Sequence, residues 1–171
     1  MNPRAHRFPA LEYTTVIVLA LALLAPRRAA SDPAQAAPGF ALRGLDGKTV
    51  RLTDYKGKPV VLDFWATWCG PCRAAMPHLD AIQNRYRERG LVVLGVSVDD
   101  GGPQRVKRYA DHLGVRFRIV MADERVLDLY GPIRSIPTTF FIDRRGMVVR
   151  RVVGYLDQET LESYAEEVLG D

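Results

Sequence analysis

The sequence predicts an α/β domain in which a central mixed β-sheet carries helices on both faces. Residues 59–66 and 91–99 are nearly continuous apolar runs, which is typical of strands buried on both faces. A helical pattern follows each of these runs, over residues 71–90 and 103–114. The resulting strand–helix–strand order predicts two neighbouring parallel strands joined by a helix that covers one face of the sheet.

The other elements are bounded by turn and capping signals. Residues 40–52 predict an N-terminal β-hairpin, because two short alternating runs flank the turn pair Asp46-Gly47. The last helix is expected to begin after Asp157, whose side chain can cap it. The second half predicts a short edge strand over residues 117–121 and a short helix over 124–131. Two strands joined by a turn follow over residues 138–143 and 147–154, and a closing helix covers 157–169.

Residues 1–25 predict an export signal or a membrane anchor. Arg4 and Arg7 precede an uncharged run from Tyr13 to Ala25, which is the pattern of an export segment. As a helix this run would span roughly 20 Å, which is short for a bilayer core of about 30 Å. The best small-residue cleavage site, Ala34-Gln35-Ala36, lies far from the run. We therefore expect an uncleaved anchor, with a removed signal peptide as the alternative.

The rest of the chain divides into a linker and one domain. Residues 26–37 are rich in Pro and Ala and predict a tether, and residues 38–171 predict the folded domain. We expect this domain to be extracytoplasmic, on the periplasmic side of the cytoplasmic membrane, and to be a monomer. After residue 38 there are 20 basic and 18 acidic residues, so no nucleic-acid partner is expected.

Cys69 and Cys72 are the only cysteines in the chain, and three kinds of non-catalytic site could use them. A structural disulfide would close a loop of only four residues, and short loops constrain the unfolded chain least. A structural zinc site normally needs four ligands, and His6, His78 and His112 are scattered in the sequence. A Cu(I) site suits thiolates, but no third ligand is evident, so no metal is expected.

A reversible dithiol–disulfide couple has positive support from its neighbours. Cys69 follows a predicted buried strand and stands where the next helix begins, and a helix N-terminus favours thiolate over thiol. Cys72 lies one turn further on, where it can attack a mixed disulfide formed by Cys69. Pro71 fits the first turn of a helix, where its missing N–H has no partner to lose. The motif therefore predicts redox catalysis with no cofactor beyond the Cys69–Cys72 disulfide.

The segments "VVLDFWATWCGPCRAAMPHL", "SIPTTFFID" and "VVGY" resemble the thioredoxin superfamily, and within it the membrane-tethered TlpA/ResA-type thiol–disulfide oxidoreductases of bacteria. The resemblance covers about residues 38–169 and implies a thioredoxin fold with the N-terminal hairpin and a strand–helix insert. It implies a cis peptide bond before Pro137, with the backbone at Ile136 pairing with an extended substrate. The alternative for Pro137 is an ordinary proline at the start of a strand.

The resemblance also implies roles for the residues that flank the cysteines. Trp68, with Gly70 and Pro71, would shield the cysteines and contact the substrate, whereas simple core packing is the alternative for Trp68. The family commonly has a proton-handling Glu three residues after the second cysteine, but this chain has Ala75 there. We expect Asp63, within a buried strand, to take the proton from Cys72 instead. The alternative places Asp63 at a solvated strand end.

The expected function is that of a protein-disulfide reductase acting on exported proteins. The Gly-Pro pair between the cysteines resembles that of reducing members of the superfamily. A membrane thiol-reducing electron donor is then implied, and the resemblance suggests apocytochrome c as a client. Three alternatives stay open: a disulfide oxidant or isomerase, a copper-binding chaperone and a thiol peroxidase. For the last, Thr67 stands two positions before Cys69 and matches a Thr-x-x-Cys pattern only loosely.

Overall fold

The computed structural model describes residues 35–170, which form a six-stranded mixed sheet flanked by helices. The strand order is β1-β8-β7-β4-β5-β6, with β4 parallel to β5 and antiparallel to β7. Strand β4 lies in the interior of the sheet, which explains why all six of its residues are buried. The sheet strands are β1 (Gln35–Ala36), β4 (Val60–Trp65), β5 (Val92–Ser97), β6 (Arg118–Met121), β7 (Thr138–Ile142) and β8 (Met147–Val153).

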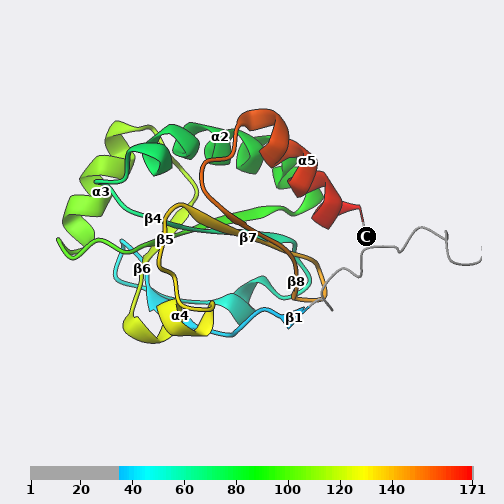
Figure 1. The fold of residues 1–171 in the computed structure, drawn as a ribbon, viewed down its shortest axis with the longest axis horizontal. Helices are drawn as coiled ribbons and strands as arrows, with labels where there is room; N and C mark the ends of the chain where they lie inside the picture. The colour runs from blue at the N-terminus through cyan, green and yellow to red at the C-terminus, as the bar shows by residue number, and fades with distance from the viewer. Residues whose placement is uncertain (1–34, 171) are drawn as a thin grey trace, which may run out of the picture. The chain divides into compact units, whose positions relative to one another are not determined.

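Two hydrophobic cores cover the two faces of this sheet. Helices α2 (Gly70–Tyr86), α3 (Pro103–His112) and α5 (Gln158–Leu169) cover one face (Figure 1). The hairpin of β2 (Ala41–Arg43) and β3 (Thr49–Arg51) covers the other face together with α4 (Glu124–Leu129). Two short 3₁₀ helices, η1 (Leu52–Tyr55) and η2 (Arg87–Arg89), complete the fold. The predicted mixed sheet with helices on both faces is confirmed.

The start of the domain differs from the prediction. Gln35 and Ala36 were expected in the linker, but they form strand β1 and pair with Val148 and Met147 of β8. The Ala37 N–H then donates to the Gly146 carbonyl over 2.8 Å. The domain therefore includes residues that the composition assigned to a tether, because a two-residue strand at a sheet edge leaves no periodic pattern in the sequence.

The expected export segment, residues 1–25, lies outside the described residues. Within residues 35–170, no helix has the length and apolar character needed to cross a bilayer.

Candidate active site

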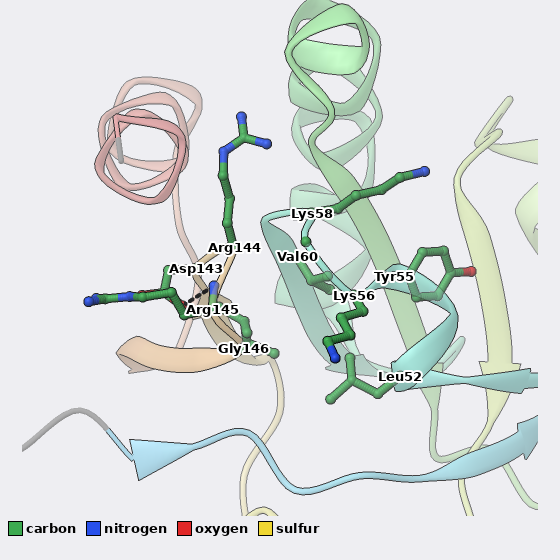
Figure 2. A pocket seen from close by; sticks show the side chains of 11 residues that line it. Leu52, Tyr55, Lys56, Lys58, Val60, Asp143, Arg144, Arg145 and Gly146 are labelled. Carbon is green, nitrogen blue, oxygen red and sulfur yellow. Dashed lines mark hydrogen bonds and ion pairs between the residues drawn. The ribbon is translucent and has the colours of Figure 1, made fainter.

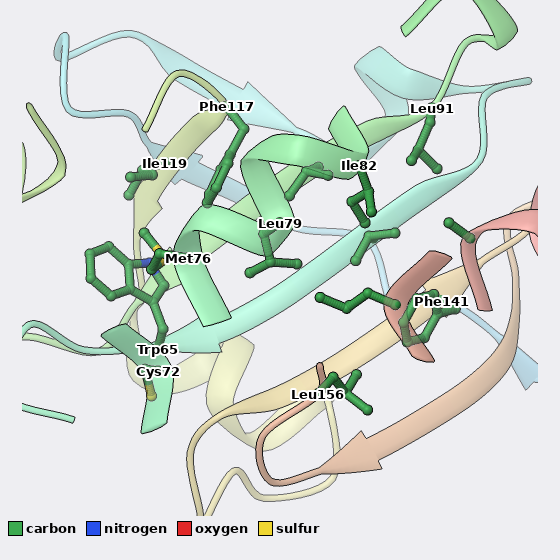
Figure 3. Close-up of a cluster of buried hydrophobic side chains, with 14 of the residues drawn as sticks. Trp65, Cys72, Met76, Leu79, Ile82, Leu91, Phe117, Ile119, Phe141 and Leu156 are labelled. Atoms are coloured by element: carbon green, nitrogen blue, oxygen red, sulfur yellow. The ribbon is translucent and has the colours of Figure 1, made fainter. Parts of the chain in front are cut away.

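Cys69 and Cys72 lie where the loop after β4 enters helix α2, and a disulfide joins them. The two sulfur-bearing residues differ in accessibility: Cys69 is 6 % exposed, whereas Cys72 is fully buried. Figure 3 shows Cys72 at the edge of the core beside Trp65 and Met76. A reagent approaching from solvent therefore reaches Cys69 first.

Cys69 is the N-cap of α2, as the sequence predicted. Its sulfur accepts a hydrogen bond from the Cys72 N–H over 3.2 Å, and its carbonyl accepts from the Arg73 N–H. Gly70 and Pro71 occupy the first turn and are exposed. In the reduced protein, a Cys69 thiolate would meet the same N–H and the positive end of the helix dipole. Both favour the ionised form of the thiol.

The peptide bond between Ile136 and Pro137 is cis, and it lies beside the disulfide. The Ile136 carbonyl oxygen is 3.7 Å from the Cys69 sulfur. The Pro137 carbonyl accepts from the Gly154 N–H over 2.8 Å, which joins this loop to the end of β8. The structure thus brings together Cys69, Ile136 and Pro137, which are far apart in the sequence, as the resemblance implied.

Asp63 is a buried carboxyl group in the middle of β4, with 1 % of its surface exposed. Its neighbours Val61 and Trp65, two residues away on the same face of the strand, belong to the core that contains Cys72. Thr139 Oγ1 donates to Asp63 Oδ1 over 2.7 Å, and within residues 35–170 Oδ2 has no hydrogen-bond partner. Burial raises the pKa of Asp63 to about 7, although the Thr139 hydrogen bond opposes this shift. The alternative of a solvated strand end is therefore wrong.

A second buried carboxyl group, Asp99, holds the loop that carries the cysteines. Asp99 accepts hydrogen bonds from the backbone N–H of Thr67 over 2.9 Å and from the Thr67 hydroxyl over 2.5 Å. The Ser97 hydroxyl also donates to it, over 2.8 Å. Sequence reasoning considered Thr67 only as part of a peroxidase pattern and gave Asp99 no role. The one available signal was a carboxylate directly after a buried strand.

Three exposed apolar side chains, Trp68, Val153 and Tyr155, lie at the end of the sheet that carries the disulfide, and we call them the apolar rim. Trp68 is 63 % exposed, so its alternative as a core residue is wrong, and the buried tryptophan of this loop is Trp65. Val153 pairs with Thr138, directly after Pro137, and Tyr155 follows Gly154. Sequence reasoning gave Val153 and Tyr155 no role, although the segment containing Gly154 and Tyr155 carried part of the resemblance.

Two further positions bear on the alternatives for this site. Ala75 is buried within α2, so no carboxylate stands where the resembling family commonly has one. The ring nitrogens of His78 lie 3.1 Å from Gln158 Oε1 and from the Tyr155 hydroxyl. Within residues 35–170, no group of three or more His, Cys, Asp or Glu side chains is arranged to hold a metal ion.

The arrangement can perform dithiol–disulfide exchange. One cysteine is reachable at a helix N-terminus, its partner lies beneath it, and a buried carboxyl group with a pKa near 7 lies in the adjacent strand. Together with the mixed sheet, these features define a thiol–disulfide oxidoreductase of the thioredoxin fold.

Comparison with known proteins agrees with this class. The family model described as "AhpC/TSA family" matches residues 33–151. The thiol-disulfide oxidoreductase ResA of Geobacillus thermodenitrificans is 39% identical over 134 residues, which cover 77% of this chain and 75% of that protein. The chain belongs to the AhpC/TSA family and is a homologue of the ResA thiol-disulfide oxidoreductases.

Solved structures give the same fold. A thiol:disulfide interchange protein of the thioredoxin family from Chlorobium tepidum superposes with a TM-score of 0.75 at 30% identity. The match covers 82% of this chain and all of that one. The thioredoxin domain of a thiol-disulfide oxidoreductase from Bacteroides vulgatus superposes with a TM-score of 0.67 at 27% identity, covering 79% of this chain and 99% of that domain.

Proposed function

We propose that this oxidoreductase works outside the cytoplasm as a reductase of disulfides in exported proteins, with apocytochrome c as a client. The observation that carries the proposal is the order of the two sulfurs. Cys69 is reachable beside the Ile136 carbonyl, and Cys72 is buried beneath it. Such an order suits one cysteine for attack on a protein disulfide and the other for resolution of the intermediate.

The reaction begins with the reduced enzyme. The Cys69 thiolate attacks one sulfur of the substrate disulfide, so that a mixed disulfide forms and one substrate thiolate leaves. Cys72 then loses its proton and attacks the Cys69 sulfur, which releases the second substrate thiolate and forms the Cys69–Cys72 disulfide. Two electrons have passed from the enzyme to the substrate. A membrane thiol-reducing donor must return two electrons before the next cycle, and the Cys72 thiol must regain the one proton that it lost.

Asp63 is the proposed acceptor of the Cys72 proton. A carboxyl group whose pKa is near 7 can take and return a proton close to neutral pH. The unpartnered Oδ2 leaves one lone-pair position of Asp63 available for this transfer. The resembling family commonly has a proton-handling Glu at the position of Ala75, which has no carboxylate. Asp63 is therefore the proposed proton acceptor in its place.

The apolar rim and the backbone of the loop before Pro137 are the proposed contacts for the substrate. The Ile136 backbone offers a hydrogen-bonding edge beside Cys69, and an extended substrate peptide can pair with such an edge. The same end of the sheet offers exposed apolar surface, from Trp68, Val153 and Tyr155. Exposed apolar surface of this kind marks interaction sites. Gly70 adds no side chain to this surface, and a Cβ there would meet no atom within 4 Å.

The location follows from the expected anchor at residues 1–25, and it can be tested separately. In intact cells treated with a mild reductant, a membrane-impermeant maleimide should label Cys69 of the full chain. A matched Cys69→Ser variant should remain unlabelled. Labelling that appears only after the cells are lysed would place the domain in the cytoplasm and contradict the proposed location.

Reduction of the proposed client can be measured directly. The reduced domain, residues 34–171, is mixed with an oxidised peptide that carries a Cys-x-x-Cys-His segment, and the thiols formed on the peptide are quantified. We expect stoichiometric transfer by the wild type and none by the Cys69→Ser variant. A domain that reduces insulin but leaves this peptide oxidised would remove apocytochrome c as the client while keeping the reductase.

The alternatives predict other readouts. A disulfide oxidant or isomerase would transfer its Cys69–Cys72 disulfide to reduced, unfolded proteins. A copper chaperone would hold Cu(I) through its reduced cysteines, and a thiol peroxidase would consume hydrogen peroxide with electrons from a thiol donor. We expect none of these activities to approach the rate of disulfide reduction.

A further inference from the structure

The end of the sheet opposite the disulfide carries a concentration of positive charge. Three loops meet there, residues 52–59, 87–91 and 143–146, and we call them the basic pole. They hold six of the 20 basic and three of the 18 acidic residues that follow residue 38. The rest of the domain therefore has 14 basic and 15 acidic residues. The net positive charge of the whole domain comes from the basic pole.

Hydrogen bonds hold the three loops of the basic pole together. The Arg144 guanidinium donates to the Arg89 carbonyl over 2.9 Å, and the Val92 N–H donates to the Pro59 carbonyl over 3.0 Å. A pocket lies between the first and third loops, with Lys56 and Lys58 on one side and Arg144 on the other (Figure 2). The backbone segments that carry the cationic residues are thus joined to one another by hydrogen bonds.

The basic pole keeps a net charge of +3, because its six basic residues exceed its three acidic residues. Within residues 35–170, no carboxylate forms an ion pair with Lys56, Lys58 or Arg144. Asp143 is buried and already paired with Arg145, and Asp54 accepts from the backbone N–H of Arg51.

Two carboxylates from the end of α5 are also occupied. Glu166 accepts a hydrogen bond from the Tyr86 hydroxyl, and Glu167 pairs with Arg150. Neither carboxylate therefore neutralises the lysines of the basic pole.

The described chain also begins at the basic pole. Strand β1 pairs with the start of β8, and the Ala37 N–H donates to the Gly146 carbonyl, which belongs to the third loop. Figure 2 shows β1 passing beside Gly146. The chain therefore enters the domain at the basic pole, whereas the disulfide lies beyond the far end of β4. A six-residue strand is about 20 Å long, so the two ends of the domain are well separated.

We propose that the basic pole is a docking surface for a bilayer that contains anionic phospholipid. The proposal rests on the proposed membrane anchoring through residues 1–25. Only nine residues separate Ala25 from Gln35, and they span at most about 35 Å when fully extended. The tether keeps the basic pole close to the bilayer, where lipid phosphates complement its charge. Docking in this way directs the disulfide away from the membrane.

A vesicle-binding experiment tests the surface without the anchor. Both hydrophobic cores lie within residues 37–169, and the Bacteroides vulgatus relative is a thioredoxin domain by itself, so residues 34–171 are expected to fold alone. This domain is sedimented with phosphatidylcholine vesicles, with or without roughly one phosphatidylglycerol in three lipids. We expect binding only to the anionic vesicles, and loss of that binding when salt is raised to about 0.5 M.

A charge-matched pair of variants locates the binding surface. The triple variant Lys56→Gln, Lys58→Gln and Arg144→Gln should bind anionic vesicles about a hundredfold more weakly, at about fivefold for each charge removed. The control variant, Arg105→Gln, Arg108→Gln and Arg125→Gln, removes three charges outside the basic pole. Its affinity for anionic vesicles should fall by less than about tenfold. Equal losses in the two variants, or no vesicle binding by the wild type, would overturn the proposal.

A second measurement uses the full chain in reconstituted vesicles. The chain has four lysines, and two of them, Lys56 and Lys58, lie at the basic pole. Their acetylation should slow in anionic vesicles relative to zwitterionic ones, while that of Lys107 in α3 stays constant. Unchanged acetylation of Lys56 and Lys58 would contradict docking. Thiol exchange by the triple variant should match the wild type, so a failure of docking is distinguishable from a failure of the reductase.

Discussion

At the residue scale, the chemistry depends on two differences in burial. Cys69 is slightly exposed and Cys72 is not, which gives the two sulfurs different tasks. Asp63 is buried with a single hydrogen bond, so its pKa lies near 7 rather than near its ordinary value of 3.8. The roles of these three residues and the burial of Asp63 could be predicted from the sequence. The difference in exposure between Cys69 and Cys72 could not, because it depends on how the start of helix α2 packs against the sheet.

The first prediction concerns which cysteine attacks the substrate and which resolves the mixed disulfide. The Cys72→Ser variant should accumulate a mixed disulfide with a protein substrate, because Cys69 can still attack but nothing resolves the product. The Cys69→Ser variant should form none, since Cys72 is fully buried. Non-reducing electrophoresis after incubation with oxidised insulin measures both. If the Cys69→Ser variant formed as much mixed disulfide as the Cys72→Ser variant, Cys69 would not be the attacking cysteine.

The second prediction concerns the stability that Asp63 contributes at different pH values. Because its pKa is raised, the folded protein keeps the Asp63 proton to a higher pH than the unfolded chain does. Its contribution to the free energy of unfolding is therefore greatest below about pH 4 and is lost as the pH rises through about 7. A shift from 3.8 to about 7 corresponds to a change of about 4 kcal/mol.

The Asp63→Asn variant cannot ionise, so it removes this pH dependence. Relative to the oxidised wild type, its free energy of unfolding should rise by about 4 kcal/mol between pH 4 and pH 8. Urea unfolding at several pH values measures the difference. The same variant should resolve mixed disulfides more slowly, because Cys72 loses its proton acceptor. A stability difference that is independent of pH, or an unchanged rate of resolution, would contradict the role of Asp63.

At the scale of elements, the site depends on two loops that the sheet brings together. The β4–α2 loop carries Cys69 and leads into α2, which carries Cys72, and Thr67 in this loop is held by Asp99, two residues after β5. The loop before β7 carries the cis Ile136–Pro137 bond. Sequence patterns predicted the strands and helices that flank these loops. They did not predict the Asp99 contacts, because a hydrogen bond between residues 32 positions apart leaves no periodic signal.

The third prediction tests the Asp99 network. Asp99→Ala removes the acceptor of three hydrogen bonds and leaves the buried Thr67 N–H without a partner. We expect a loss of roughly 3 kcal/mol in the free energy of unfolding. The control Ser97→Ala removes one donor to the same carboxylate and should lose about 1 kcal/mol. Equal losses in urea unfolding would show that Asp99 does not hold the loop.

At the scale of the whole domain, the two ends of the sheet have different surfaces. The apolar rim lies at the end of the sheet that carries the disulfide, and the chain enters the domain at the basic pole, at the other end. The sequence predicted only part of the first end, because Trp68, Cys69 and Cys72 belong to one motif whereas Val153 and Tyr155 come from the end of β8 and the loop after it. It did not predict the second, because the six basic residues come from three loops that only the fold brings together.

We expect this thiol–disulfide oxidoreductase to act as a reductant, and its reduction potential separates a reductant from a disulfide donor. Residues 34–171, which retain strand β1, are equilibrated in graded dithiothreitol buffers, and the fraction of Cys69–Cys72 disulfide is measured. We predict a potential near that of thioredoxin, about −270 mV, which requires a donor of electrons at the membrane. A potential near about −120 mV would make the protein a donor of disulfides and would contradict the account.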